Sequence, residues 1–366
     1  MADGTKERIS GSAPRYCNTK AAAQEALREH IERLRNPVAP PAPEKEVPLF
    51  EEFAKEFLEN YVRANNKPAE HESKRSVLDC HLVPAFRGKR IDEIKPRLIE
   101  AYKAEKLRAG RAIKRKGEGP GLSWKTVNNH LTILRRMLAI AKQWEIIDSI
   151  PDITWLKGPK AEFDFLDFEE AERLVASADE GEWRTMMLLA LKTGMRQGEL
   201  RALRWDDVDL HKGLIVVRQN IVRGHVGTPK SGKGREIPLS DQALAALRSH
   251  RHLRGELVFS NADGDYWKKN ECKHPLWRAC KRAGIRRIGW HVLRHSFASH
   301  LVMRGVPLKA IQELLGHATI EMTMRYSHLS PDVTRSAVLA LDEAPPEYAG
   351  PRGKAVAKTP TRLASS

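Results

Sequence analysis

Several features are scarce in this chain, and each scarcity argues against a class of protein. The four cysteines are scattered without a Cys-x-x-Cys pair, which argues against a disulfide framework or a zinc ribbon. No apolar run approaches the length of a membrane-spanning helix, and the polar N-terminus lacks the apolar stretch of a secretion signal. We therefore expect a reduced, cytoplasmic protein that uses no metal and no other cofactor and has no membrane partner.

Acidic residues are also in the minority. The 366 residues include 63 Lys and Arg against 47 Asp and Glu, which gives a formal net charge of +16. A basic excess of this size favours a polyanionic partner, most commonly nucleic acid. The length is sufficient for two or three domains, each with its own core.

The two ends of the chain differ from its middle. Residues 1–45 are expected to be disordered except for one helix over residues 19–35, which is followed by a Pro-rich linker over residues 37–43. Residues 342–366 are rich in Pro, Ala, Ser and charge, which is typical of a disordered tail.

Residues 46–151 have the pattern of an all-helical domain. Apolar residues recur at helical spacing over residues 50–61, over a second helix that ends near Pro84, and over residues 94–107. A fourth helix should start at a cap at Ser123 or Thr126. Four helices with basic connections are consistent with a DNA clamp.

Residues 152–164 have the position of an interdomain linker, and residues 165–341 predict a mixed α+β domain. Two β-runs, over residues 214–220 and 235–239, flank a Gly- and Lys-rich turn over residues 224–234. This pattern predicts a small antiparallel sheet among helices.

Two arginines are candidates for neutralising a phosphate, because a guanidinium can donate two parallel hydrogen bonds to it. Arg196 follows Gly194 at a turn, and Glu199 lies three positions on, where it can orient the guanidinium. Taken alone, the pair would more often be an ordinary ion pair. His291 and Arg294 are three positions apart on one helix, so both should project from one face and meet one phosphate.

Tyr326 lies nine positions after His317, which follows Gly316 at an expected helix end. An isolated tyrosine is commonly a half-buried aromatic with its hydroxyl satisfied. Surrounded by the arginines and histidines above, its phenol becomes a candidate nucleophile for an anionic ester. His295 is assigned to packing or to a helix hydrogen bond, because a single histidine is usually structural.

These separated segments, in this order, resemble the tyrosine recombinase (phage integrase) family over residues 48–341. The resemblance implies a four-helix, SAM-like core-binding domain followed by a mixed α+β catalytic domain. The helix over residues 19–35 is similar to the last helix of an arm-type DNA-binding domain. Every position where the resemblance implies a catalytic residue is occupied by the expected residue type: Arg196, Lys230, His291, Arg294, His317 and Tyr326.

By the same resemblance, His291 assists proton transfer at the tyrosine and His317 holds the scissile phosphate. Measured back from Pro238, Lys230 falls where the family keeps the hairpin lysine that protonates the leaving 5′-hydroxyl. Lys233 is the alternative for that role. A basic hairpin that only touches backbone phosphates is a further interpretation.

Several polar residues are predicted to contact DNA, although a run of charge is usually only a solvated face. Arg325 and His328, which flank Tyr326, are assigned to the surface or to DNA, without a chemical role. The other predicted contacts lie on the helical domain and the hairpin: Lys114, Arg115, Lys116, Lys125, Asn128, Asn129, Arg135, Lys233 and Arg235.

The implied reaction joins two double-stranded DNA sites of a phage or mobile element through a 3′-phosphotyrosyl link and a Holliday junction. The partners expected with it are a homotetramer on nucleoid DNA and accessory DNA-bending proteins. A helix beginning near Pro331 is expected to dock on a neighbouring protomer. The alternatives are a type IB topoisomerase, which relaxes DNA without exchanging partners, and a DNA-binding regulator without a reactive site.

Overall fold

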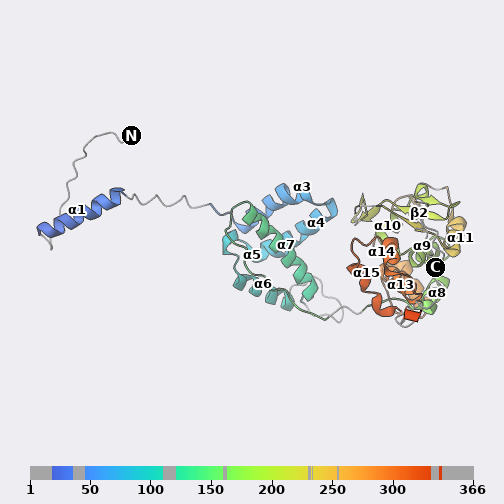
Figure 1. Cartoon of the computed structure of the whole chain (residues 1–366). Coiled ribbons are helices and arrows are strands. Elements are labelled where there is room, and N and C mark those ends of the chain that lie inside the picture. The colour runs from blue at the N-terminus through green and yellow to red at the C-terminus, as the bar shows by residue number, and fades with distance from the viewer. Residues whose placement is uncertain are drawn as a thin grey trace, which may run out of the picture. The chain divides into compact units, whose positions relative to one another are not determined.

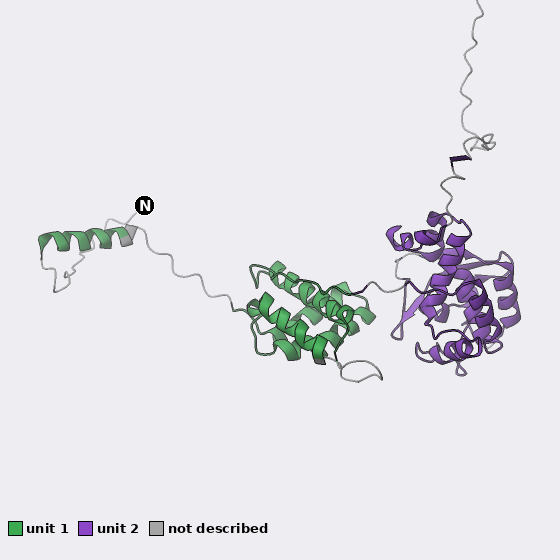
Figure 2. Ribbon diagram, turned by 90° about the horizontal axis from the view of Figure 1, so that it is seen from below, with its two compact units in different colours: residues 1–158 green, residues 159–366 purple. Residues whose placement is uncertain are grey.

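The computed structural model describes residues 19–35, 46–109, 121–159, 163–229, 232, 234–253, 255–330 and 338–339. The chain divides into two compact units, residues 1–158 and residues 159–366 (Figure 2). Separate clusters of buried apolar side chains stabilise the two units. The expected multidomain class, an all-α domain followed by a mixed α+β domain, is confirmed (Figure 1).

The predicted helices of the first unit are present. Helix α7 begins after Ser123, whose Oγ accepts the N–H of Thr126 at 3.2 Å and satisfies a free donor of the first turn. The elements are α1 (Lys20–Arg35), α2 (Phe50–Glu56), η1 (Phe57–Val62), α3 (Arg63–Asn65), α4 (Pro68–Val77), η2 (Leu78–Leu82), α5 (Val83–Phe86), η3 (Ile91–Glu93), α6 (Pro96–Ala109) and α7 (Trp124–Gln143).

The second helix continues past Pro84 to Phe86. A proline inside a helix removes one backbone donor and crowds the preceding turn. Here the turn Leu78–Leu82 is π-helical, which widens the hydrogen-bond ladder just before the proline. The helix therefore ends at Phe86, two residues after Pro84 and close to the predicted end.

The first half of the predicted linker belongs to the first unit, which extends to Gly158. Lys103 Nζ donates to the carbonyl of Thr154 at 2.8 Å. The side-chain amide of Asn128 donates to the Leu156 carbonyl at 2.9 Å and accepts the Leu156 N–H at 3.0 Å. Polar side chains of α6 and α7 thus hold the extended segment 152–158 in place.

The second unit consists of helices around two small antiparallel sheets. Its elements are α8 (Phe168–Ala176), α9 (Glu182–Thr193), α10 (Gln197–Arg201), η4 (Trp205–Asp207), β1 (Val208–Asp209), β2 (Leu214–Val217), β3 (Asn220–Val222), β4 (His225–Gly227), β5 (Arg235–Pro238), α11 (Asp241–His250), α12 (Lys273–Arg282), α13 (Trp290–Met303), α14 (Leu308–Leu315), α15 (Glu321–Met324) and η5 (Ser327–Leu329).

The predicted strand over residues 214–220 is divided between the two sheets. Strand β2 pairs with β1 and β5, with Ile215 opposite Ile237, whereas β3 pairs with β4. Part of the predicted turn is therefore a second hairpin. Arg223 and Gly224 both have positive φ (53° and 87°), which is the conformation of a two-residue hairpin turn.

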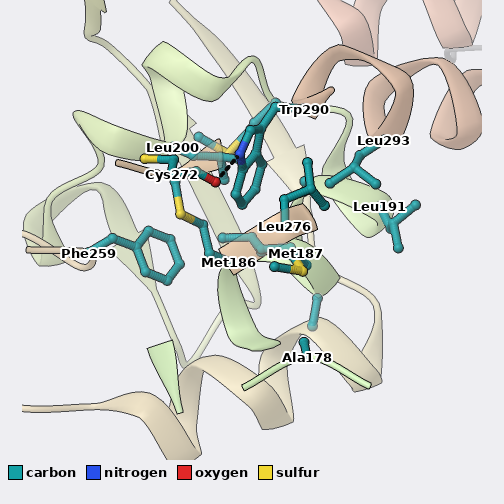
Figure 3. Close-up of a cluster of buried hydrophobic side chains, with 14 of the residues drawn as sticks. Ala178, Met186, Met187, Leu191, Leu200, Phe259, Cys272, Leu276, Trp290 and Leu293 are labelled. Atoms are coloured by element: carbon teal, nitrogen blue, oxygen red, sulfur yellow. Dashed lines mark hydrogen bonds between the residues drawn. The ribbon is translucent and has the colours of Figure 1, made fainter. Parts of the chain in front are cut away.

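The core of the second unit fixes the start of α13, the helix that carries His291 and Arg294. The indole N–H of Trp290 donates to the Cys272 carbonyl at 2.8 Å, and the buried ring lies in the same cluster as Leu200 and Leu276 (Figure 3). Because the first residue of α13 is anchored in the core, the next turn of the helix has a defined position.

The described residues contain no helix that is both long enough and apolar enough to cross a membrane. Among the same residues, no three His, Cys, Asp or Glu side chains are grouped as a metal site.

Candidate active site

The turn that presents Arg196 requires glycine at two positions. Gly194 ends α9 with φ +64°, and a Cβ there would lie 2.4 Å from Cδ1 of Phe297. Gly198, inside α10, lies so close to β3 that a Cβ would be 2.1 Å from Oδ1 of Asn220. Contacts this close are unavailable to any residue with a side chain, so the two glycines allow the tight packing that fixes Arg196.

A buried carboxylate organises this site. Glu199 is 1% exposed; it accepts from Arg196 at 2.8 Å and from both terminal nitrogens of Arg235 at 2.8 and 3.2 Å. Burial by itself would raise the pKa of Glu199, but the hydrogen bonds and charges of Arg235 and Arg196 outweigh it and lower the pKa to about 2. Glu199 is therefore ionised at neutral pH and orients Arg196, as its spacing suggested.

Arg235 lies elsewhere than the sequence suggested. We expected it to contact DNA, but only 8% of its side chain is exposed, and its Nε donates to the Leu314 carbonyl at 2.8 Å. With its two contacts to Glu199, the guanidinium joins β5, α10 and the end of α14. Its position indicates that it holds the site together, because its side chain is buried and each of its three nitrogens donates to a protein acceptor.

His291 and Arg294, which are expected to project from one helix face, differ in burial. His291 is exposed, whereas Arg294 is 1% exposed and donates to the carbonyls of Gly194 and Leu315, both at 2.6 Å. Burial, followed by the charge of Arg196, lowers the pKa of Arg294 to about 9, so it remains protonated at pH 7. The two carbonyls leave other N–H groups of the guanidinium for a ligand.

His317 lies where the sequence placed it, after the left-handed Gly316 that ends α14. Its Nδ1 is 2.9 Å from Oγ1 of the buried Thr323. Burial first, and then the charges of Arg294 and Arg196, lower the pKa of His317 to about 3. The ring is neutral at pH 7, and a neutral imidazole can still donate one hydrogen bond to an anion.

Tyr326 is 1% exposed, and its hydroxyl oxygen lies 2.8 Å from Nδ1 of His295. The ring of Phe163 packs edge-on against it, with centroids 5.3 Å apart. Burial raises the pKa of Tyr326 and outweighs the opposing charges of Arg294 and Arg325, so the resting side chain is a neutral phenol.

The contact with His295 was missed, because His295 was assigned to packing or to a helix hydrogen bond. A signal was present: His291 and His295 are four positions apart, which puts them on one helix face. Their rings meet edge to face, with centroids 4.6 Å apart. The face that carries the predicted catalytic histidine thus also carries the partner of the phenol.

The predicted DNA-contact residues of α7 separate into two groups. Lys125, Asn129 and Arg135 are exposed and available to a ligand. The amide of Asn128 instead binds the backbone of Leu156 through both its oxygen and its nitrogen. Five other predicted residues lie outside the described residues: Lys114, Arg115, Lys116, Lys230 and Lys233.

Comparison with known proteins places both units in one family. Residues 164–332 match the phage integrase family, and residues 49–107 match the phage integrase N-terminal SAM-like domain. The chain is 30% identical to the integrase of Salmonella phage P22 over 220 residues, which are 57% of this chain and 54% of the phage protein. It is 33% identical to tyrosine recombinase XerC of Xanthomonas axonopodis pv. citri over 221 residues, which are 57% of this chain and 69% of that protein.

Solved structures share the fold. The Tn1549 transposon integrase in complex with a circular intermediate DNA superposes with a TM-score of 0.65 at 20% identity, covering 80% of this chain and 98% of that one. A lambda integrase dimer bound to a COC′ core site gives a TM-score of 0.61 at 18% identity, covering 84% and 86%. The chain spans 54% to 65% of the length of the first relatives that it matches.

Proposed function

Because the chain belongs to the phage integrase family of tyrosine recombinases, we propose that it is a site-specific DNA recombinase that cuts and rejoins DNA through Tyr326. The observation that carries this proposal is a chain of contacts. Arg294 donates to the carbonyl of Gly194, two residues before Arg196, and His295, next to Arg294, meets the Tyr326 hydroxyl. The charges of Arg196 and Arg294 both act on Tyr326, and both arginines are held by buried protein acceptors. A pure DNA binder has no need of a buried tyrosine in such surroundings.

In the proposed reaction, the Tyr326 oxygen attacks a DNA phosphate and the bond to the 5′-oxygen breaks. Arg196 and Arg294 neutralise the non-bridging oxygens, a task that a metal performs in other phosphoryl-transfer sites. His317 donates to the phosphate from its neutral ring. His291 lies at the edge of the site, and Lys230, or alternatively Lys233, supplies the proton that the leaving 5′-oxygen needs.

The 3′-phosphotyrosyl bond keeps the energy of the broken phosphodiester, so a free 5′-hydroxyl from a second duplex can reverse the step. Two such exchanges through a Holliday junction would integrate or excise a phage or mobile element. We propose a homotetramer on nucleoid DNA in the cytoplasm, assisted by DNA-bending proteins. The helix that is expected to begin near Pro331, of which only residues 338–339 are described, would dock on a neighbouring protomer.

Covalent capture tests the proposal directly. A binding site is first enriched from random duplexes and then built as a nicked DNA that loses its 5′-hydroxyl fragment after cleavage. Wild type should form a band with EDTA present that survives denaturation. Tyr326→Phe should form none, and the matched variant Tyr266→Phe should behave as wild type.

The other outcomes distinguish the alternative functions. If wild type binds the DNA but no band forms, the chain is a regulator and the proposed chemistry is wrong. If the band forms and supercoils relax, but two sites are never joined, the chain acts as a topoisomerase.

A further inference from the structure

The hydroxyl of Tyr326 lies in a small aromatic enclosure. His295 of α13 provides a ring nitrogen 2.8 Å from the phenol oxygen. Phe163 packs edge-on against the rings of both residues, with centroid distances of 5.3 Å to Tyr326 and 5.5 Å to His295. Arg325 lies over Phe163, with its guanidinium carbon 5.5 Å from the ring centroid. The Tyr326 hydroxyl thus meets a ring nitrogen of His295, while its ring packs against Phe163 and lies below the Arg325 guanidinium, whose carbon is 5.9 Å from the Tyr326 ring centroid.

We propose that His295 positions the nucleophile and accepts its proton. Phe163 packs against the rings of Tyr326 and His295 and keeps them in hydrogen-bonding orientation. This inference rests on the proposed function, because it assigns a partner to the reacting oxygen of that site. It differs from the expectation that His291 assists proton transfer at the tyrosine. The phenol contacts His295 directly, and the ring of His291 lies against that of His295.

The proton transfer balances without any further reactant. As the Tyr326 Oη–phosphorus bond forms, the phenolic proton passes along the existing hydrogen bond to Nδ1 of His295. The phosphorus–O5′ bond breaks, and the leaving oxygen takes a proton from a separate acid, for which Lys230 is proposed. In the rejoining step, the 5′-hydroxyl attacks phosphorus and gives its proton to the acid that was deprotonated in cleavage. The Tyr326 Oη–phosphorus bond breaks as His295 returns its proton to the tyrosine oxygen.

The charges around His295 suit an acceptor that is neutral at rest. Burial first, then His291, Arg325 and Arg294, lower the pKa of His295 to about 4, while Asp164 opposes them. The unprotonated ring can therefore accept a hydrogen bond at pH 7. A bound phosphate would bring negative charge near the ring and raise its pKa, which favours proton transfer only when substrate is present.

Phe163, which packs against Tyr326 and His295, lies directly after the segment that joins the two units. It is the first described residue after residues 160–162, at the start of the catalytic unit. Its ring also meets those of Phe165 and His328, at 5.7 and 5.4 Å. A change in the path of the chain at this point would move a ring that contacts the nucleophile.

The test compares His295→Gln with His300→Gln in the full-length protein on the nicked substrate. His300 lies on the same helix, and its Nε2 is 2.8 Å from the Leu166 carbonyl, so it controls for the loss of a half-buried histidine. We expect His295→Gln to slow covalent capture by about 100-fold or more, the usual contribution of a general base. His300→Gln should remain within about twofold of wild type, and gel-shift affinity should be equal in all three proteins.

Two readouts separate proton transfer from simple support of the fold. The capture rate of wild type should vary little between about pH 6 and 8, whereas that of His295→Gln should rise about tenfold per pH unit, because its tyrosine must ionise unaided. A DNA with a bridging 5′-sulfur has a leaving group that needs no proton. On this DNA the capture rate of Lys230→Ala should return towards that of wild type, whereas the capture rate of His295→Gln should stay low.

Either of two results would overturn the inference. One is His295→Gln reacting as fast as wild type, or more slowly with an unchanged pH profile. The other is recovery of His295→Gln on the 5′-sulfur substrate, which would place His295 at the leaving group. Failure of wild type itself to capture DNA would instead overturn the proposed function.

Phe163→Leu, which keeps apolar bulk, should slow capture less than Phe163→Ala.

Discussion

The two units of this protein contain the same hydrogen-bonded pair in two different surroundings. In the first unit, the Tyr102 hydroxyl lies 2.7 Å from Nδ1 of the buried His130. In the second, the Tyr326 hydroxyl lies 2.8 Å from Nδ1 of His295. Burial lowers the pKa of both histidines to about 4 and raises the pKa of both tyrosines.

What differs is the balance of charge on each phenol, although one cation, Lys106 Nζ, also lies 5.4 Å from the centroid of the Tyr102 ring. After burial, the influence on Tyr102 is the carboxylate of Glu105, which raises the pKa of the phenol further. The corresponding influences on Tyr326 are the charges of Arg294, Arg325 and Arg196, which oppose the effect of burial and lower the pKa of the phenol. If Tyr326 is the nucleophile that we propose, a buried histidine partner is therefore not what distinguishes it from Tyr102. In the proposed mechanism, the arginines that stabilise a phenolate and bind a phosphate distinguish the Tyr326 pair from the Tyr102 pair.

The largest expected effect comes from removing the hydroxyl of Tyr326, with removal of the Tyr102 hydroxyl as the comparison. Tyr326→Phe should lower covalent capture by about 10⁴-fold or more, because no other group can form the ester. Tyr102→Phe should leave the capture rate within about twofold of wild type while lowering the free energy of unfolding by about 1 kcal/mol, the typical loss of one hydrogen bond. Capture gels and urea denaturation measure the two effects. A loss of capture in Tyr102→Phe at full DNA binding would contradict the comparison.

The next effect concerns the carboxylate that holds the arginines. The pKa of Glu199 is about 2 in the folded protein, below its ordinary value of 4.5, so its ionisation stabilises the fold above about pH 4.5. This contribution is lost progressively as the pH falls towards 2. Glu199→Gln should lower the free energy of unfolding at pH 7 by about 3 kcal/mol and flatten its dependence on pH below 4.5.

Glu170→Gln is the matched control for that experiment. Glu170 pairs with Arg286 at 2.7 Å, but the arginine side chain is 43% exposed. An exposed pair of this kind contributes about 0 to 1 kcal/mol. Equal destabilisation by the two substitutions would show that the burial of Glu199 has no special effect.

A smaller effect concerns the pH dependence of the first unit. Because the pKa of folded His130 lies at about 4, below the ordinary value of 6.5, the unfolded chain binds more protons between these values. The stability of the first unit should therefore fall as the pH is lowered from about 6.5 to about 4, and less so in His130→Gln. Hydrogen exchange of the α7 amides in the full chain would measure this. An unchanged pH dependence in the variant would exclude His130 as the cause.

The smallest effect distinguishes the exposed residues of α7 from the one that holds the linker. Lys125→Ala and Arg135→Ala should each reduce the salt dependence of DNA affinity by about one unit of slope, as expected for one lost phosphate contact. Asn128→Ala should leave that slope unchanged and lower stability, because two backbone groups of Leu156 lose their partner. Affinity titrations over a range of salt measure the slopes, and equal slopes in all three variants would argue against DNA contact by α7.

Local pattern was sufficient for much of the fold and part of the site. The helix that begins at Ser123 and the turn at Gly316–His317 followed from capping and glycine signals that act within a few residues. The orientation of Arg196 by Glu199 followed from their spacing of three positions. Each of these predictions depends on neighbours in the sequence, which the spacing of residues reveals.

The sequence by itself thus determined the helices, the basic charge and the candidate catalytic residues. Only the tertiary structure assigned their partners: Tyr326 meets His295 from 31 positions away, Arg235 meets Glu199 from 36, and Asn128 meets Leu156 from 28. The physical reason is that amphipathic spacing reports which face of an element is buried, but not which side chain lies opposite. Burial then set the chemistry, because a phenol, an imidazole or a guanidinium changes its pKa when packing removes water around it.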